Sequence, residues 1–344
     1  MNFLDLFASL QAWIFETLVQ PVIFFTGLGE FTEDAFEGVE WFLIGVCELL
    51  ILFVLLRPLE ALIPVHRFND RNARWNDFIY TALHRLGIFS LLIFVSLDPA
   101  LDALTGVLHL EGVNPFNLDN LWPGLVDYPV LVFIVYLVLL DFFDYWYHRA
   151  SHQFNWWWAL HSLHHSQRDM NLWSDNRNHL LDDFIRDVYM GLIAIAIGVQ
   201  PGQYALLVVI SRMVESLQHA NIRLHFGAIG ERLLVSPRYH RTHHAIGIGH
   251  ESQGSGTLGG HNFAVLFPIW DMLFGTALFS KEFSMTGIRD QLPSPDGRSG
   301  REYGRGFWSQ QSLGLKRLFG LDHRTATPMN AQTDRQTGFN KEAS

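Results

Sequence analysis

Apolar residues in this chain gather into runs that are long enough to cross a lipid bilayer. Residues 41–63, 78–97 and 128–147 are predominantly apolar, and a helix needs about 20 such residues to span the hydrocarbon core. Residues 188–211 form a fourth run, which "QPGQ" interrupts near its middle, so two helices that meet at a turn are expected there. The pattern predicts an all-α integral membrane protein with about four transmembrane helices.

The N-terminal residues 1–37 carry a weaker pattern. They contain Asp5 and Glu16 and lack the basic start of a signal peptide, so we expect them to be retained. They form either an interfacial helix or a partly embedded first span, and Pro21 favours the interfacial alternative.

The C-terminal part of the chain turns polar from residue 281. We expect a membrane domain over residues 38–280 and a polar extension over 281–344. Within the extension, residues 306–320 predict a short surface helix, and about twenty residues at the end have a composition typical of disorder.

The charges of the segments that connect the apolar runs predict how the protein is oriented in the membrane. The connection 64–77 carries several arginines, whereas residues 98–127 carry aspartate and glutamate but no lysine or arginine. Because lysine and arginine favour the cytoplasmic side, the 64–77 connection is expected to face the cytoplasm. The run 128–147 then returns the chain to that side, which places residues 148–187 there as well.

Composition agrees with a membrane protein and narrows the chemistry. The 344 residues are 49% apolar, 14% aromatic and 17% charged, with a mean hydropathy of +0.13, which is more apolar than an average soluble domain. A net charge of −10 argues against nucleic-acid binding. Cys47 is the single cysteine, so this chain offers no disulfide, cysteine zinc site or iron–sulfur site, and a metal would need nitrogen or oxygen ligands.

Histidines supply the strongest chemical pattern. Of 17 histidines, 11 lie between His148 and His244. The motif "HRASH" spaces two of them at i, i+4, and "HSLHH" and "HRTHH" each space three at i, i+3, i+4. On a helix these spacings share one face, so each motif can present its imidazoles to one point. These three histidine boxes contain His148, His152, His161, His164, His165, His240, His243 and His244. So many imidazoles exceed the capacity of one ion, which predicts two ions such as Fe, Zn, Cu or Ni.

A packing role for the histidines and a structural zinc site are the two alternatives to a two-ion site. Isolated histidines near a membrane interface are usually hydrogen-bonded packing residues, and we expect this of His66, His84, His109 and His323. A structural zinc site commonly closes with four ligands that include cysteine, which does not fit this nitrogen-rich set.

Carboxylates near the boxes are expected to accept hydrogen bonds from the outer N–H groups of the imidazoles. Asp141 and Asp144 precede His148 by seven and four residues, close to its helix face. A further acidic group follows His179 and contains Asp182, Asp183 and Asp187.

Two other motifs have simpler explanations. Trp146, Trp156, Trp157 and Trp158 are expected to mark the bilayer interface, where indoles are favoured. The sequence "GSGTLG" at 254–259 matches GxGxxG without a preceding strand or a following helix, so it predicts a flexible loop and not a dinucleotide site.

The three boxes, with "QHANI" and "NFAVLFPIWDMLFGT", resemble the membrane fatty acid hydroxylase and sterol desaturase superfamily, particularly its bacterial members. The resemblance covers roughly residues 40–280. It implies a di-iron centre held by at least eight histidines, with O2 as co-substrate and electrons from an external donor, such as a ferredoxin or a cytochrome with its reductase. It also implies location in a bacterial inner membrane, with the boxes facing the cytoplasm.

The resemblance further implies individual ligands. All eight histidines of the boxes match the family's ligand positions, and His219 of "QHANI" matches an additional one. Glu215 stands where some members have another histidine. Asn221, in the same segment, and His179, in "RNHLLDD", are secondary candidates for the site or the pocket wall, together with Asp141 and Asp144.

The sequence leaves three functions open. The first is O2-dependent hydroxylation of a lipid C–H bond, the second is desaturation at the same metal centre, and the third is metal binding or transport without catalysis. The substrate is expected among fatty acyl chains, polar lipid headgroups, sterols or hopanoids, carotenoids and alkyl glycerol ethers.

Overall fold

The structure, a computed structural model, describes residues 2–68, 70–113, 116, 118–247, 260–293 and 300–322. These residues form helices joined by turns, with two isolated bridges and no β-strand, which confirms the predicted all-α class. The "GSGTLG" motif, His323 and the rest of the expected disordered tail lie outside the described residues. The chain forms two compact units. The first contains residues 1–140, 170–177 and 184–223, and the second contains residues 141–169, 178–183 and 224–344.

The first unit begins with a continuous helical segment. It consists of α1 (Phe3–Ile14), the π-helical turn η1 (Phe15–Val19) and α2 (Gln20–Thr26). Pro21 lies in the first turn of α2, directly after this π turn, and such local π adjustments accommodate the N–H that proline lacks. The segment is long and apolar enough to cross a membrane. It therefore meets the length requirement of a partly embedded first span, the alternative to an interfacial helix.

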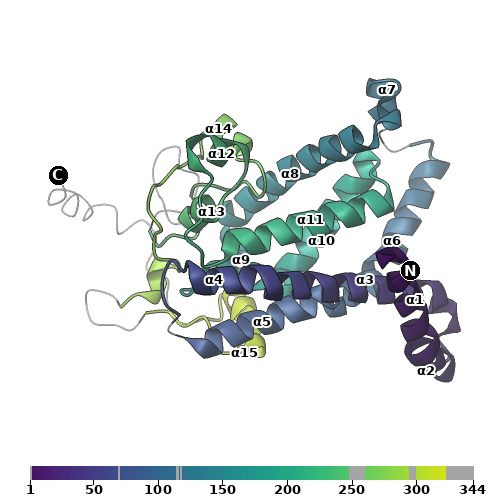
Figure 1. Cartoon of the computed structure of the whole chain (residues 1–344), viewed down its shortest axis with the longest axis horizontal. Coiled ribbons are helices and arrows are strands. Elements are labelled where there is room, and N and C mark those ends of the chain that lie inside the picture. Colours follow the sequence, from purple (N-terminus) through teal and green to yellow (C-terminus); the bar gives the residue numbers. More distant parts are fainter. Residues whose placement is uncertain are drawn as a thin grey trace. The chain divides into compact units, whose positions relative to one another are not determined.

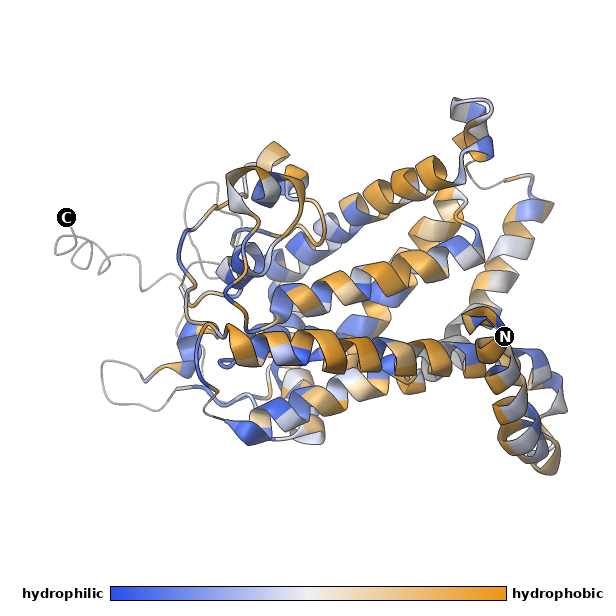
Figure 2. Cartoon of the chain, viewed as in Figure 1, coloured by the Kyte–Doolittle hydropathy of each residue, from blue (hydrophilic) through white to orange (hydrophobic). Residues whose placement is uncertain are grey.

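A second long helix follows. The short η2 (Gly29–Phe31), α3 (Thr32–Ile51), the π turn η3 (Leu52–Leu56) and α4 (Arg57–Leu62) form one run over residues 29–62, which is longer than the predicted 41–63. Apolar residues cover most of its length (Figure 2). Phe53, Val54 and Leu55 are each more than 60% exposed. Such a surface is unfavourable in water and favourable against lipid.

The apolar run over residues 78–97, predicted as one span, is divided between two helices. The chain instead forms α5 (Arg71–Arg85) and α6 (Ile88–Leu110), separated at Gly87, whose φ of 74° is left-handed. Glycine adopts this conformation without the steric cost of a side chain, so it divides the apolar run. Helix α6 continues past Pro99, so much of the acidic segment expected as a loop is helical.

The predicted helical hairpin is confirmed. Helices α10 (Leu180–Ile197) and α11 (Pro201–His219) are joined by a short turn and run side by side (Figure 1). Gly198 has a φ of 75°, and a Cβ there would collide with the carbonyl of Phe116. The hydroxyl of Tyr136 donates to the carbonyl of Gly198 at 3.0 Å, which ties the turn to α8 (Pro129–Gln153).

The remaining part of the first unit completes its core. The short α7 (Leu118–Leu121) and η4 (Leu125–Asp127) precede α8, and η5 (Ser174–Asn176) lies between the second and third histidine boxes. Leu118, Leu125, Val132, Leu140 and Leu207 are buried together. This cluster fixes the helices that lead toward the boxes.

The second unit contains short helices. They are α9 (Asn155–His165), α12 (Gly227–Leu233), α13 (Pro237–His243), α14 (Ile269–Leu273), η6 (Arg289–Gln291) and α15 (Phe307–Leu318). Helix α15 confirms the helix predicted over 306–320, but it is not only a surface helix. It packs against α9 and buries Gln310, Gln311 and Gly314.

Three helices among the described residues are long and apolar enough to cross a membrane: Phe3–Thr26, Gly29–Leu62 and Pro129–Gln153. They support a membrane protein, as the apolar runs predicted. The count of about four spans and the cytoplasmic orientation stay predictions.

Candidate metal centre

The three histidine boxes lie on helices, as their spacing predicted. The first box occupies the last turns of α8, and the second occupies the end of α9. The third lies on α13 and its C-cap residue His244; Ser236 caps the start of this helix by accepting a hydrogen bond from the Tyr239 N–H, with Pro237 in the first turn. Phe154 has extended backbone between α8 and α9 and so separates the first two boxes into different helices.

The second unit brings these histidines into two groups. The first group contains His148, His152, His165 and His243, all buried. One ligand nitrogen from each lies within 4.8 Å of the others. This group combines residues from all three boxes, which are almost one hundred residues apart in the sequence.

The second group in this unit contains His164, His240 and His244, whose ligand nitrogens also lie within 4.8 Å of one another. The Nε2 atoms of His240 and His244 are 3.1 Å apart. The rings of His165 and His244 are stacked, with centroids 4.3 Å apart, so the two groups are adjacent. The geometry therefore offers two neighbouring nitrogen-lined positions.

His161 lies beside both groups without belonging to either. Its ring centroid is 5.3 Å from that of His148 and 5.4 Å from that of His164. Its Nδ1 is bonded to Asp182, and its buried Nε2 has no hydrogen-bond partner among the described residues. The sequence-based assignment of His161 as a ligand stays a prediction.

Several rings are held so that Nε2 is the nitrogen available to a metal. The Nδ1 of His148 donates to the carbonyl of Phe263 at 2.8 Å, and the Nδ1 of His243 donates to that of His261 at 2.7 Å. A carbonyl can only accept, so Nδ1 carries the proton and Nε2 keeps its lone pair. Such partners are typical of metal-binding imidazoles. The donor set thus fits two ions bound by neutral imidazoles.

A sharp turn presents both carbonyls. Asn262, between His261 and Phe263, has a φ of 61°. Its side chain donates to the carbonyls of Tyr239 and Leu278 and accepts from the Leu278 N–H. These bonds hold a left-handed conformation that asparagine tolerates better than most residues.

Asp271 fixes the segment that follows this turn. Its carboxylate accepts from the N–H groups of Phe263 and Ala264 and from the hydroxyls of Tyr239 and Thr276, at 2.7–3.0 Å. The motif "NFAVLFPIWDMLFGT" contains Asn262 and Asp271, but its pattern predicted no role for either residue. The charged residue in this otherwise apolar motif was the available signal.

Asp182 confirms one of the predicted orienting carboxylates. It accepts from the Nδ1 of His161 at 2.9 Å, the Nε1 of Trp157 at 2.7 Å and the hydroxyl of Tyr147 at 2.8 Å. Burial acts to raise the pKa of Asp182, but these hydrogen bonds outweigh it and hold the pKa below its usual value. The carboxylate is therefore ionised at neutral pH and can fix the His161 ring.

Asp141 has a different role from the one predicted. It accepts from the N–H groups of Leu266 and Phe267 and from the indole of Trp270, at 2.7–3.0 Å, and so anchors the segment after the turn. Asp144 is buried one helical turn before His148.

His179 is held as a structural residue. Its Nε2 donates to the carbonyl of Gln311 at 3.0 Å, and its Nδ1 accepts from the Leu181 N–H at 3.1 Å. Both nitrogens are engaged, and burial lowers the pKa of the ring. His179 thus connects the start of α10 to α15 and belongs to neither histidine group.

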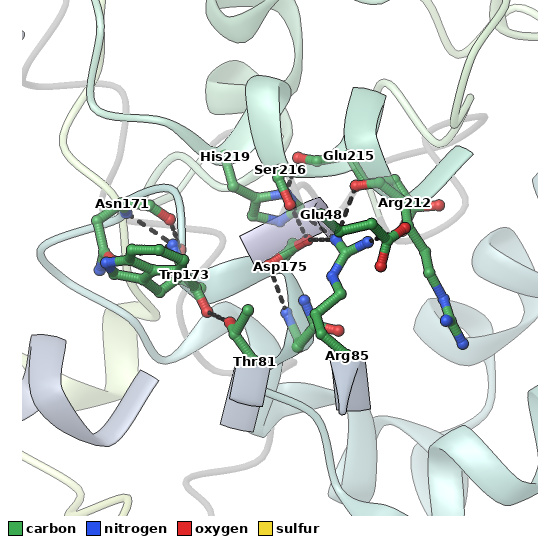
Figure 3. Close-up of polar contacts among 12 residues, drawn as sticks. Glu48, Thr81, Arg85, Asn171, Trp173, Asp175, Arg212, Glu215, Ser216 and His219 are labelled. Carbon is green, nitrogen blue, oxygen red and sulfur yellow. Dashed lines mark hydrogen bonds and ion pairs between the residues drawn. The ribbon is translucent and has the colours of Figure 1, made fainter. Parts of the chain in front are cut away.

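His219 lies at the end of α11 in the first unit (Figure 3). Its Nδ1 donates to the carbonyl of Glu215 at 2.8 Å, which again leaves Nε2 as the ligand nitrogen. Burial lowers the pKa of His219, so the ring is neutral, as metal binding requires. Its expected participation in the second group stays a prediction.

Glu215 and Asn221, the other secondary site candidates in the first unit, each contact other residues of the chain. The carboxylate of Glu215 lies 3.5 Å from the guanidinium of Arg186. Asn221 donates from its side chain to the carbonyl of His66 at 2.7 Å, and its N–H donates to Glu60 at 2.9 Å. These contacts fix the chain directly after His219.

A buried ion network that the sequence pattern did not predict holds the last turns of α11 (Figure 3). The guanidinium of Arg85 lies 3.0 Å from Glu48 and 3.1 Å from Asp175, and it donates to Ser216 and to the carbonyl of Arg212 at 2.9 Å. Ser216 in turn donates to Asp175 at 2.6 Å. Ser216 precedes His219 by three residues, so this network positions that histidine.

The tryptophans divide into two pairs. Trp146 and Trp156 are 38% and 49% exposed, which agrees with the predicted interfacial role. Trp157 instead donates to Asp182, and Trp158 lies against His152 and His165, with ring centroids 5.1 and 5.4 Å apart. An interfacial role alone is therefore wrong for this second pair.

The fatty acid hydroxylase family model matches residues 133–276, a segment that contains all three histidine boxes and His219. This match agrees with the resemblance that the histidine boxes indicated. The two nitrogen-lined positions lie within the family's matched segment.

The curated relatives have names that describe lipid-modifying enzymes. The alkylglycerol monooxygenase of Xenopus tropicalis is 29% identical over 74% of this chain and 52% of its own, and that of Homo sapiens is 30% identical over 54% and 38%. The ornithine lipid hydroxylase OlsE of Rhizobium tropici is 26% identical over 54% of this chain and 56% of its own. The chain spans about half or less of the length of the first two relatives. No solved structure matches it.

The role of Asp182 can be tested directly. In Asp182→Asn, His161 loses a charged acceptor, and metal affinity is expected to fall by roughly 10–100-fold, the usual effect of such a change. Metal content of the purified protein during competition with a chelator measures it. Asp183→Asn is the matched control, and an equal loss in both variants would contradict the role of Asp182.

Proposed function

We propose that the chain is a membrane-bound, O2-dependent hydroxylase that uses two iron ions to oxidise a C–H bond of a lipid. The observation that carries the proposal is the pair of adjacent histidine groups in the second unit. The fatty acid hydroxylase match and the names of the curated relatives support lipid hydroxylation.

In this proposal, one ion is bound by the first group of four histidines. The other is bound by His164, His240 and His244, with His219 as the further ligand implied by the "QHANI" motif. His161, whose Nε2 lies buried beside both groups, completes the nitrogen set.

The iron pair, when bound, supplies O2 activation and one-electron chemistry that amino-acid side chains lack. The chain's own residues orient and protect the site. The carbonyls of Phe263 and His261 and the carboxylate of Asp182 keep a proton on Nδ1 of three histidines. Buried Tyr145, Leu160, Leu163 and Phe263 in the same unit help exclude water.

The membrane setting suits a lipid substrate. The exposed apolar helices of the first unit are suited to lipid contact, and substrate enters from the bilayer. By analogy with the names of the relatives, we propose a polar lipid or a glycerol ether as the substrate class. The histidine groups face the cytoplasm of a bacterial inner membrane, where an external ferredoxin or cytochrome system delivers electrons.

Comparative lipid mass spectrometry tests this proposal. Membranes that contain the wild-type chain, its electron donor and air are expected to accumulate a lipid with one added oxygen, which His164→Ala membranes lack. Incorporation of label from 18O2 would show that the oxygen comes from O2. A product that lacks two hydrogens would replace hydroxylation by desaturation. Identical lipid profiles in the presence of a reducing donor, despite bound metal, would favour metal binding without catalysis.

A further inference from the structure

A separate pocket lies in the first unit, at the end of the helix Gly29–Leu62. It has a cavity volume of about 230 Å³, and its lining contains the guanidinium-bearing residues Arg57, Arg71 and Arg74. Arg57 belongs to α4, and the other two lie in the first turn of α5. This volume is smaller than that of most sites that enclose a whole small molecule, so the pocket suits a headgroup.

The three arginines carry more positive charge than the nearby carboxylate balances. Arg57 lies 4.0 Å from Oε2 of Glu60, and Glu60 also attracts Arg74 electrostatically. The other oxygen of Glu60, Oε1, accepts the N–H groups of Leu172 and Asn221 at 2.8 and 2.9 Å. Glu60 is thus a shared structural acceptor, and the pocket retains an excess of positive charge.

Asp70 is the other acidic residue close in sequence, and it is engaged by the helix. Its carboxylate accepts from the N–H groups of Asn72 and Ala73 as the N-cap of α5. Arg74 lies over the ring of Phe68, at 4.7 Å from its centroid. These contacts leave the guanidinium groups suited to an external anion with several oxygen atoms.

Aromatic rings form the rest of the pocket. Trp75 stacks on Phe78 with centroids 5.2 Å apart, and Phe78 meets Trp173 edge-on at the same separation. Trp75 and Phe53 are 63% and 62% exposed, whereas Trp173 is buried. The rings therefore continue from the apolar outer surface into the pocket.

This combination identifies the kind of ligand. The arginines lie where an apolar helix ends, so they are at the height of lipid headgroups if that helix spans the bilayer. Arginine binds phosphate by paired hydrogen bonds, and aromatic rings at an interface accept acyl chains and glycerol carbons. A ligand that has both parts is an anionic glycerophospholipid.

We propose that Arg57, Arg71 and Arg74 bind the phosphate headgroup of an anionic phospholipid from the surrounding bilayer, with its glycerol and acyl carbons against Trp75 and Phe53. This site is independent of the histidine groups and of the proposed hydroxylation. It requires no metal, O2 or electron donor.

Native mass spectrometry of the full chain in detergent, titrated with phosphatidylglycerol or phosphatidylcholine of identical acyl chains, tests the site. The wild type is expected to retain phosphatidylglycerol more strongly. Arg71→Gln and Arg74→Gln are each expected to weaken that binding by about tenfold, because each removes charge-assisted hydrogen bonds. Arg67→Gln, a change of equal charge at an exposed residue outside the pocket lining, is the matched control.

Three outcomes would overturn the proposal. They are equal retention of both lipids by the wild type, equal losses in Arg67→Gln and the pocket variants, and displacement of phosphatidylglycerol by millimolar inorganic phosphate. The last would assign the pocket to a soluble phosphate. Thermal unfolding of each variant identifies a loss of binding that comes only from misfolding.

Discussion

Replacing His165 by alanine is expected to reduce bound iron from two ions to one or fewer per chain and to remove lipid oxidation. His165 is fully buried, belongs to the first group and stacks against His244 of the second. It therefore lies where the two groups meet. Loss of its imidazole removes one nitrogen ligand and leaves the neighbouring imidazoles without a fixed spacing.

Two further variants separate ligand loss from cavity formation. His165→Gln keeps most of the side-chain volume but replaces the imidazole, so it is expected to lose iron as His165→Ala does. His109→Ala removes an exposed histidine of α6 and is expected to retain full iron content. Elemental analysis by mass spectrometry gives the metal count, and full iron in His165→Ala would exclude His165 as a ligand.

Replacing Arg85 by leucine is expected to destabilise the fold by about 3–5 kcal/mol, the usual cost of removing one partner from a buried ion pair. Arg85 is 2% exposed, and Glu48 and Asp175 are also buried. Without the guanidinium, Glu48 and Asp175 each lose their ion-pair partner, and Ser216 and the carbonyl of Arg212 each lose a donor. Denaturant unfolding of the protein in detergent measures the change.

The surrounding ion pairs supply the comparisons. Arg186 and Glu215 lie 3.5 Å apart and are partly exposed, so Arg186→Ala is expected to cost less than about 1 kcal/mol. Adding Glu48→Gln to Arg85→Leu removes one uncompensated charge and is expected to recover part of the stability. Equal losses in Arg85→Leu and Arg186→Ala would mean that the buried network contributes no more than a surface pair.

The sequence predicted the helical boxes because their chemistry and their spacing are both local. Histidines three and four residues apart must share a face if the segment is a helix, and α8, α9 and α13 meet that condition. The hairpin of α10 and α11 was equally local, since "QPGQ" begins two residues after Gly198, the glycine at the turn.

The predictions from the sequence were wrong where a side chain's partner is distant in sequence, or where a single backbone angle decides whether a helix continues. Gly87 divides an apolar run that composition alone makes continuous. Asp141 resembled an orienting carboxylate for His148, but its partners are three N–H groups at Leu266, Phe267 and Trp270. His179 is engaged by Gln311, more than 130 residues away. Periodicity contains no information about such pairings.

The turn at Asn262 is synthesised long after the first histidine box, so the assembly of the histidine groups depends on the order of synthesis. His148 emerges from the ribosome 115 residues before Phe263, the carbonyl of which fixes its tautomer. At typical elongation rates this interval is on the order of ten seconds. During that time the imidazole of His148 is free to exchange its proton between both nitrogens. For the proposed metal centre, we therefore expect selective loading only after the segment that carries residue 263 has folded onto the boxes.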